Sequence, residues 1–336
     1  MNTRRLHKLL LEWFQKQARI LPWRERDCQP ALDATSSSAT VRDATIQSYF
    51  VQTQMRDPYK VVVAELMLQQ TQVDRVVPKY LAFMKRWPSA QALAKAKLSE
   101  VLIEWKGLGY NRRARFLHEM AKMIIEEYRG NFPNSEKELR NLPGLGEYTA
   151  RAVLTFGFGQ DVGVIDTNVL RIFCRVFYGK ESGDLNIGKQ DLRQLVDNTV
   201  PKGKGDPWNQ ALMDLGAMIC TAKSPQCDIC PLQKLCQANC DAKQSGEKNY
   251  AQVLSRLSKT RTQPKKKKEK FKDSDRFFRG KIIDILREGP QKMEQLYKNI
   301  SEHHNLSDKK RWGELIESLM IEKLIQIKRT TVSLRE

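Results

Sequence analysis

Residues 220–236 read CTAKSPQCDICPLQKLC, and this stretch decides the fold that we expect. It contains four closely spaced cysteines, Cys220, Cys227, Cys230 and Cys236. Thiolates suit zinc or an iron–sulfur cluster, and four of them in one short segment can hold a single metal centre. Structural zinc usually takes its ligands as two pairs separated by a longer span, whereas 4Fe-4S clusters use one closely spaced run. The spacing therefore favours a 4Fe-4S cluster, with zinc as the alternative.

The composition limits what the rest of the chain can be. Its 336 residues are enough for about two domains, each with its own core. No run approaches the roughly 18 apolar residues of a membrane span, and we expect no signal peptide, because residues 6–18 have the pattern of an amphipathic helix. Seven cysteines, four of them in ligand spacing, fit a reducing intracellular compartment. The net charge of +19 predicts a polyanionic partner such as DNA, RNA or anionic lipid.

One carboxylate, Glu65, lies within an apolar run. Asp57 and Pro58 supply an N-cap and a first-turn proline for a helix that continues through residues 61–68. The Val, Leu and Met residues around Glu65 disfavour its charged form, so we expect its pKa to be raised. A carboxyl of that kind can act as a general acid near neutral pH. The alternative is that Glu65 faces water on an amphipathic helix.

A second carboxylate, Asp166, lies at the start of another helix. It follows the apolar residues 162–165 and precedes a helix expected over residues 167–177. As an N-cap it would contribute about 1 kcal/mol, and the helix N-terminus would also keep it ionised. One protonated and one ionised carboxyl suit the departure of a base from a sugar, by analogy with glycoside hydrolysis.

Two turns rich in glycine are candidates for contact with a nucleic acid. The GLGY turn at 107–110 presents Leu108 and Tyr110, which can wedge between bases or fold back into the core. The LPGLG turn at 142–146 precedes a helix expected over residues 147–156. Free N–H groups at that helix start can hold a phosphate, as in a helix-hairpin-helix, although a plain turn between two helices is the alternative.

The C-terminal part has a different composition. Residues 246–273 are expected to be a basic linker whose lysines add phosphate affinity independent of sequence. Residues 274–336 predict three helices and a strand pair: 276–287, 292–300 and 309–321, then 324–328 and 331–334. That order indicates a winged-helix-like domain, which can bind DNA or a protein that the sequence does not identify. Near the other end, residues 25–56 form a polar insertion, with a short strand expected at 46–51.

Several motifs together resemble the A/G-specific adenine DNA glycosylases, the MutY family, which are related to endonuclease III. They are LPWR at 21–24, DPYKV at 57–61, ELMLQQTQV at 65–73, GLGY at 107–110, LPGLG at 142–146, DTNV at 166–169 and the four cysteines. The resemblance covers about residues 5–240. It implies a mainly α-helical, two-lobed helix-hairpin-helix DNA glycosylase within residues 1–245, with a six-helix domain at about 58–165. A cluster domain would be built from about 1–24 and 166–245.

The resemblance also implies an activity and roles for named residues. Family members flip adenine out of a mispair with 8-oxoguanine or guanine in double-stranded DNA and hydrolyse its glycosidic bond. Glu65 would protonate adenine and help activate water, Asp166 would stabilise the cationic sugar, and Asn168 would lie beside them. The remaining DNA contacts implied are Arg24 in the adenine pocket, Gln69, Gln70, Thr71, Leu108 and Tyr110 near the flipped base, and Leu142, Gly144 and Gly146 in the hairpin. The four cysteines would hold a 4Fe-4S cluster, and we expect a monomer.

Tyr148 distinguishes between related activities. Relatives that cut the strand through a Schiff base have a lysine there, and a phenol cannot form that bond, so a monofunctional glycosylase is expected. Thymine mismatch glycosylases also carry this tyrosine but tend to replace the glutamines at 69–72 with arginines. The alternatives are therefore a thymine or uracil mismatch glycosylase and, from another class, a non-catalytic iron–sulfur DNA-binding module. The chain departs from the family in its 25–56 insertion and in having no recognisable Nudix-like domain.

Overall fold

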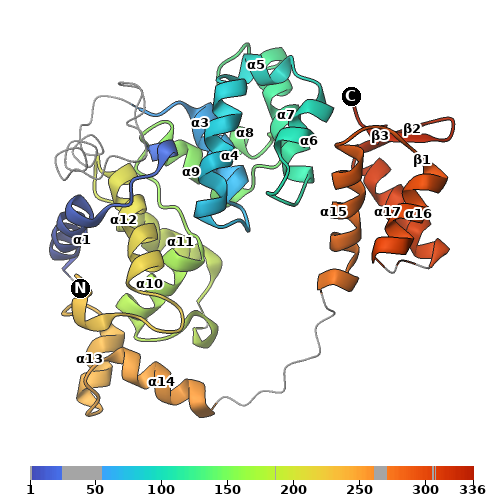
Figure 1. Cartoon of the computed structure of the whole chain (residues 1–336). Helices are drawn as coiled ribbons and strands as arrows, with labels where there is room; N and C mark the ends of the chain where they lie inside the picture. The colour runs from blue at the N-terminus through green and yellow to red at the C-terminus, as the bar shows by residue number, and fades with distance from the viewer. Residues whose placement is uncertain (1, 25–54, 186, 261–270, 305, 307) are drawn as a thin grey trace. The chain divides into compact units, whose positions relative to one another are not determined.

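A computed structural model describes residues 2–24, 55–185, 187–260, 271–304, 306 and 308–336 (Figure 1). The chain forms two compact units. The first contains Met1–Val61, Asn134–Lys137 and Gly146–Gln263, and the second contains Val62–Pro133, Glu138–Leu145 and Pro264–Glu336. Both are mainly helical, as predicted. No helix among the described residues is long and apolar enough to cross a bilayer. The predicted strand at 46–51 lies outside the described residues.

The first unit is built around contacts between residues from distant parts of the sequence. Its helices are α1 (Thr3–Gln17), α9 (Glu147–Phe156), α10 (Thr167–Tyr178), α11 (Lys189–Asn198), α12 (Gly205–Met218), α13 (Gln237–Gln244) and α14 (Tyr250–Thr260), with short 3₁₀ turns at Pro22–Arg24, Ser182–Asp184 and Cys227–Ile229. Both α1 and α10 pack against α12 (Figure 1). Their shared core includes Phe14, Phe173, Trp208 and Leu215, all at most 1% exposed.

Two of the predicted boundaries differ from the compact units into which the chain divides. The basic linker was expected to begin at residue 246, but Tyr250–Thr260 forms α14, which packs against α13 through the buried ring of Tyr250. The six-helix domain was expected to extend to about residue 165, but α9 belongs to the first unit. The buried Arg151 of α9 explains this, because its guanidinium forms ion pairs with Glu136 and Asp197 of that unit.

A buried ion network joins the N-terminal segment to α12. The fully buried carboxylate of Asp214 accepts hydrogen bonds from Arg19 Nε and from both terminal nitrogens of Arg24, each at 2.8 Å, and from the backbone N–H of Arg19 at 3.0 Å. Burial alone would raise the pKa of Asp214, but the contacts with Arg24 and Arg19 outweigh it and hold the pKa below its usual value. The network therefore fixes the segment after α1 only while Asp214 is ionised.

We expect Asp214→Asn to lower the free energy of unfolding by about 3–5 kcal/mol at pH 7, because it leaves the Arg24 charge buried and unpaired. Since the pKa of Asp214 is lowered by folding, its stabilisation is complete above the unfolded value of about 3.9 and is lost as the pH falls through the folded value. Urea unfolding at several pH values measures both effects. Asp74→Asn, at an exposed position on another helix, is the control, and an equal effect of both substitutions would contradict the prediction.

The second unit contains a helical part and the C-terminal part. Its helices and strands are most of α3 (Pro58–Leu68), α4 (Val73–Arg86), α5 (Ala90–Ala94), α6 (Leu98–Glu104), α7 (Arg112–Glu126), the end of α8 (Glu136–Leu139), α15 (Asp275–Leu286), α16 (Met293–His304), α17 (Lys309–Ile321), β1 (Gln291–Lys292), β2 (Ile325–Lys328) and β3 (Thr331–Leu334), with a 3₁₀ turn at Phe271–Asp273. Val62, Leu66, Phe83, Trp105 and Leu117 form a fully buried core among α3 to α7.

The C-terminal part contains the three helices and the strand pair that the sequence predicts. A third strand, β1, completes an antiparallel sheet in the order β1-β3-β2, with Ile327 opposite Val332 in the β2–β3 pair. The sequence did not reveal β1 because it is only two residues long. Helix α17, the third helix of this part, exposes Glu314 and Glu317 as well as Lys309 and Lys310. Its exposed surface is thus not purely basic.

Candidate metal centre and catalytic residues

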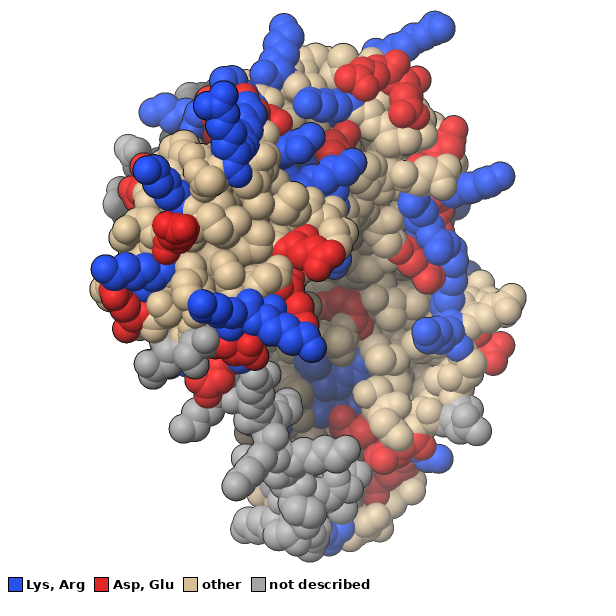
Figure 2. All heavy atoms as spheres, turned by 90° about the vertical axis from the view of Figure 1, so that its right-hand side faces the viewer, with Lys and Arg blue, Asp and Glu red and all other residues tan. Residues whose placement is uncertain are grey.

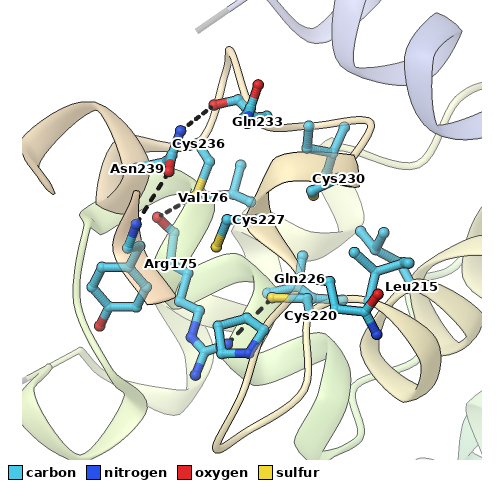
Figure 3. Close-up of a pocket in the computed structure, with 15 residues that line it drawn as sticks. Arg175, Val176, Leu215, Cys220, Gln226, Cys227, Cys230, Gln233, Cys236 and Asn239 are labelled. Atoms are coloured by element: carbon cyan, nitrogen blue, oxygen red, sulfur yellow. Dashed lines mark hydrogen bonds between the residues drawn. The ribbon is translucent and has the colours of Figure 1, made fainter. Parts of the chain in front are cut away.

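The four predicted metal ligands line one pocket. Cys220 follows α12, Cys227 begins a 3₁₀ turn that Cys230 ends as its C-cap, and Cys236 is the N-cap residue of α13. Figure 3 shows their side chains around the same cavity, which has a volume of about 430 Å³ including space open to solvent. Apolar residues such as Ile172 complete the lining. The sequence placed these cysteines together correctly because their spacing is local.

The four thiols have the chemistry to hold an iron–sulfur cluster or zinc, since both take cysteine thiolates as ligands. Burial raises the pKa of Cys230 and of Cys236 to about 12, so each needs a cation beside it to be a thiolate.

A buried arginine makes a direct contact with this cluster pocket. The terminal nitrogen Nη1 of Arg175 lies 3.4 Å from Cys220 Sγ (Figure 3). The same nitrogen donates to the carbonyl oxygen of Thr221 at 2.8 Å. Its Nε donates to Glu181 at 2.7 Å, and the hydroxyl of Tyr250 donates to the same carboxylate at 2.9 Å. An N–H group directed at a ligand sulfur stabilises the thiolate. The contacts among Arg175, Glu181 and Tyr250 were not predicted from the sequence, because Tyr250 lies in the segment predicted as a linker.

Asp166 caps α10, as the sequence predicts. Its Oδ1 accepts a hydrogen bond from the backbone N–H of Val169 at 2.7 Å, and its Oδ2 accepts one from the Asn168 amide at 2.9 Å. Both side chains are half-buried. Within the first unit the structure therefore brings together Asp166 and Asn168, two of the predicted catalytic residues. Tyr148, a third, is half-buried in the first turn of α9.

Arg171 connects this carboxylate to the cysteine pocket. It donates from Nη2 to Asn168 Oδ1 at 2.8 Å and from Nε to the carbonyl oxygen of Cys220 at 2.8 Å. Gly216 allows α12 to come this close, since a Cβ atom there would lie 2.5 Å from that of Asn168. Only a weak signal in the sequence points to Arg171, namely its position three residues after Asn168 on one helix face.

In the second unit, Glu65 lies on α3 and is only 9% exposed. Its neighbours Val62, Leu66 and Met67 are buried as well. The alternative in which Glu65 faces water is therefore excluded.

The turn after α3 contains the glutamines of the predicted DNA-contact set. Gln70 is exposed and has a φ of +55°, in the left-handed region, while Gln69 and Thr71 are half-buried. In the second predicted turn, Tyr110 is 37% exposed with a φ of +46°, and its hydroxyl accepts a hydrogen bond from Arg276. Leu108 folds back into the core and is 4% exposed, which was the alternative to a wedge.

The LPGLG turn has the backbone that its glycines allow. Gly144 has a φ of +80°, and a Cβ atom there would lie 2.8 Å from the Cβ of Phe116. Gly146 is the N-cap residue of α9, and Leu142 is 2% exposed in the core. Arg24, expected in an adenine pocket, is 3% exposed and its guanidinium is paired with Asp214, so its observed contacts are structural.

The charge of the surface is mixed. On the face drawn in Figure 2, Lys and Arg side chains are interspersed with Asp and Glu and do not form one uniform patch. The net charge of +19 suits a polyanionic partner, and on this face the basic side chains alternate with acidic ones.

Comparisons with known proteins agree with these observations. Residues 63–198 match the model of the HhH-GPD superfamily of base excision DNA repair proteins. Residues 220–236 match the model of the iron–sulfur binding domain of endonuclease III. The second match covers the four cysteines and confirms the iron–sulfur prediction over zinc.

Individual relatives are similar over most of the chain. An adenine DNA glycosylase of Mycolicibacterium smegmatis is 33% identical over 94% of this chain and 91% of its own length. The human adenine DNA glycosylase is 39% identical over 68% of this chain, which spans only 38% of that relative. A solved structure of a thermostable thymine-DNA glycosylase has a TM-score of 0.58 at 28% identity, covering 70% of this chain and 95% of that one.

Proposed function

Because the chain belongs to the adenine DNA glycosylase family of helix-hairpin-helix base excision repair proteins, we propose that it removes adenine mispaired with 8-oxoguanine or guanine in double-stranded DNA. It acts as a monomer inside the cell. The observation that supports this most is the burial of Glu65 on α3, directly before a turn that exposes Gln70. A carboxyl withheld from water suits proton donation to a base that has left its stack.

The reaction is hydrolysis of the bond between adenine and deoxyribose. Glu65 donates a proton to the adenine ring as the bond breaks, and the bonding electrons leave with the base. Asp166, held in place by Val169 and Asn168, faces the positive charge that develops on the sugar. Water then adds to the sugar carbon and gives its proton to the Glu65 carboxylate, which restores the acid.

The other site residues position these groups. Asn168 and Arg171 hold the Asp166 side chain in one orientation, since each is hydrogen-bonded to the next. Tyr148 has no amine to form a Schiff base with the sugar, so the DNA strand is left intact. When bound, the iron–sulfur cluster cross-links the segments that carry its four cysteines.

The substrate is tested by base release from four duplexes that differ in one pair: A:8-oxoguanine, A:G, T:G and U:G. We expect free adenine from the first two and no free pyrimidine from the others. The thymine-DNA glycosylase likeness makes the T:G duplex the necessary control. Release of thymine or uracil without adenine would overturn the proposal in favour of a mismatch pyrimidine glycosylase.

The monofunctional mechanism is tested on the same A:8-oxoguanine duplex. The adenine strand should stay intact after base release and should break only when the abasic product is treated with alkali. Borohydride should trap no covalent complex between protein and DNA, because Tyr148 cannot supply the required amine. A covalent complex trapped with the wild-type protein would show that an amine elsewhere in the protein attacks the sugar.

A further inference from the structure

One arginine side chain joins two turns that are distant in sequence. Arg113, in the first turn of α7, is 6% exposed. Its Nη1 donates to the carbonyl oxygens of Leu66 at 2.6 Å, Met67 at 3.0 Å and Gln69 at 2.6 Å. Its Nη2 donates to the carbonyl oxygens of Leu108 at 2.9 Å and Gly109 at 3.1 Å and lies 3.2 Å from Thr71 Oγ1. The guanidinium thus contacts the end of α3 and both turns.

These contacts give charged hydrogen-bond donors to backbone carbonyl groups at the end of α3 and in both turns. The last four carbonyl groups of a helix have no N–H donor within the helix, and a cation is favourable at that end. Burial lowers the pKa of Arg113 to about 10, partly offset by Tyr110, so the guanidinium remains charged at neutral pH. Two further hydrogen bonds support the same junction, from Thr71 Oγ1 to the Leu108 carbonyl at 3.3 Å and from Trp105 Nε1 to the Gly109 carbonyl at 3.1 Å.

The residues that project from this junction have strained backbones. Gln70 and Tyr110 are non-glycine residues in the left-handed region, with φ of +55° and +46°. Each such conformation costs about 1–3 kcal/mol and persists only when the surrounding structure enforces it. Arg113 binds the carbonyl of the residue before each of them, Gln69 and Gly109. Its contacts therefore hold the backbone that determines the direction of the Gln70 and Tyr110 side chains.

We propose that Arg113 is a positioning residue that fixes the Gln70 and Tyr110 turns as one rigid wedge, which holds the DNA open while a base is extruded. The inference rests on the proposed function and adds that these two side chains, which the family resemblance places near the flipped base, enter the duplex. Arg113 itself need not touch DNA, because it is buried. Its loss should affect base extrusion and the subsequent chemistry more than the affinity for the duplex.

Three variants test this role: Arg113→Met, Arg113→Lys and, as the control, Arg115→Met. Arg115 lies on the same helix, pairs with Glu119 at 3.1 Å and gives the same change in charge. The duplex carries 2-aminopurine in place of the adenine opposite 8-oxoguanine, because its fluorescence rises when it leaves the stack. Duplex affinity, fluorescence per bound duplex, single-turnover adenine release from the unmodified duplex and thermal unfolding are measured for each variant.

For Arg113→Met we expect loss of the fluorescence rise and about 100-fold slower adenine release, since small misplacements of positioning groups have effects of that size. The duplex affinity should change by no more than about threefold, because the phosphate contacts that dominate it remain. Arg113→Lys keeps the charge but has fewer hydrogen-bond donors, so its fluorescence rise and its rate of adenine release should lie between those of the wild type and Arg113→Met. Arg115→Met should resemble the wild type.

Wild-type fluorescence and wild-type release rates in folded Arg113→Met would overturn the proposal. If Arg113→Met does not fold, folded Arg113→Lys decides, and an unchanged fluorescence rise in it would overturn the proposal equally. A merely structural role would lower the melting temperature but leave the fluorescence per bound duplex unchanged. If the wild type releases no adenine, the proposed function fails, while a fluorescence rise lost in Arg113→Met would still support the wedge.

Discussion

Replacing Glu65 with Gln is expected to slow adenine release by about 10³-fold under single-turnover conditions, a typical size for loss of a general acid. The amide matches the carboxyl in shape, so the buried site on α3 is preserved. What it cannot do is give up a proton to adenine or accept one from water. The rate is measured by quenching the reaction with an A:8-oxoguanine duplex at successive times and quantifying the free adenine.

The control for this prediction is Glu126→Gln, at an exposed position on α7, which should release adenine at the wild-type rate. Duplex affinity of Glu65→Gln should remain within a few-fold of wild type, because the phosphate contacts are unchanged. The same pair of measurements separates the enzyme from a non-catalytic iron–sulfur module. That module would bind the mispair equally well with Glu or Gln at position 65 and would release no base in either form.

Substituting a cluster ligand is expected to have the largest effect on stability. Cys230→Ser should lose the brown colour and the broad absorbance at the blue end of the visible range, with a loss of bound iron. Because the binding free energy of a structural metal centre contributes to folding, we expect the free energy of unfolding to fall by at least about 4 kcal/mol. Absorbance, iron content and urea unfolding measure these changes.

Cys240→Ser is the matched control, because Cys240 lies four residues after Cys236 but outside the lining of the cluster pocket. It should keep the colour, the iron and the stability of the wild type. Colourless wild-type protein with one zinc per chain would contradict the cluster assignment and leave the glycosylase proposal standing.

The features that could be predicted from the sequence are those encoded by neighbouring residues. The ligand cysteines lie close together in one segment, and the Asp166 cap is decided by the residues that follow it. The Asp57 cap is likewise local, since its Oδ1 accepts a hydrogen bond from the Tyr59 backbone N–H. The spacing of apolar residues also predicted the helices and strands of the C-terminal part, within a few residues at their ends.

The features that were missed depend on contacts between distant segments. The sequence did not indicate the hydrogen bonds between Arg24 and Asp214, because the two residues are 190 positions apart. The role of Arg113 depends on carbonyl groups of another helix, for which no side-chain pattern exists. Tyr250 was assigned to a linker because the segment is basic and polar, yet its ring packs beside the cluster pocket. In each case the position of the side chain depends on contacts with distant segments, which the local sequence does not indicate.

The most direct test of the central claim is a double-mutant comparison of Glu65→Gln, Asp166→Asn and the combined variant in single-turnover adenine release. If the two carboxyls act on one nucleotide, their effects are coupled, so the combined variant should be little slower than the slower single variant. If the rate loss of the combined variant equals the product of the two single losses, the carboxyls act independently. Full activity in either single variant would contradict the proposed mechanism outright.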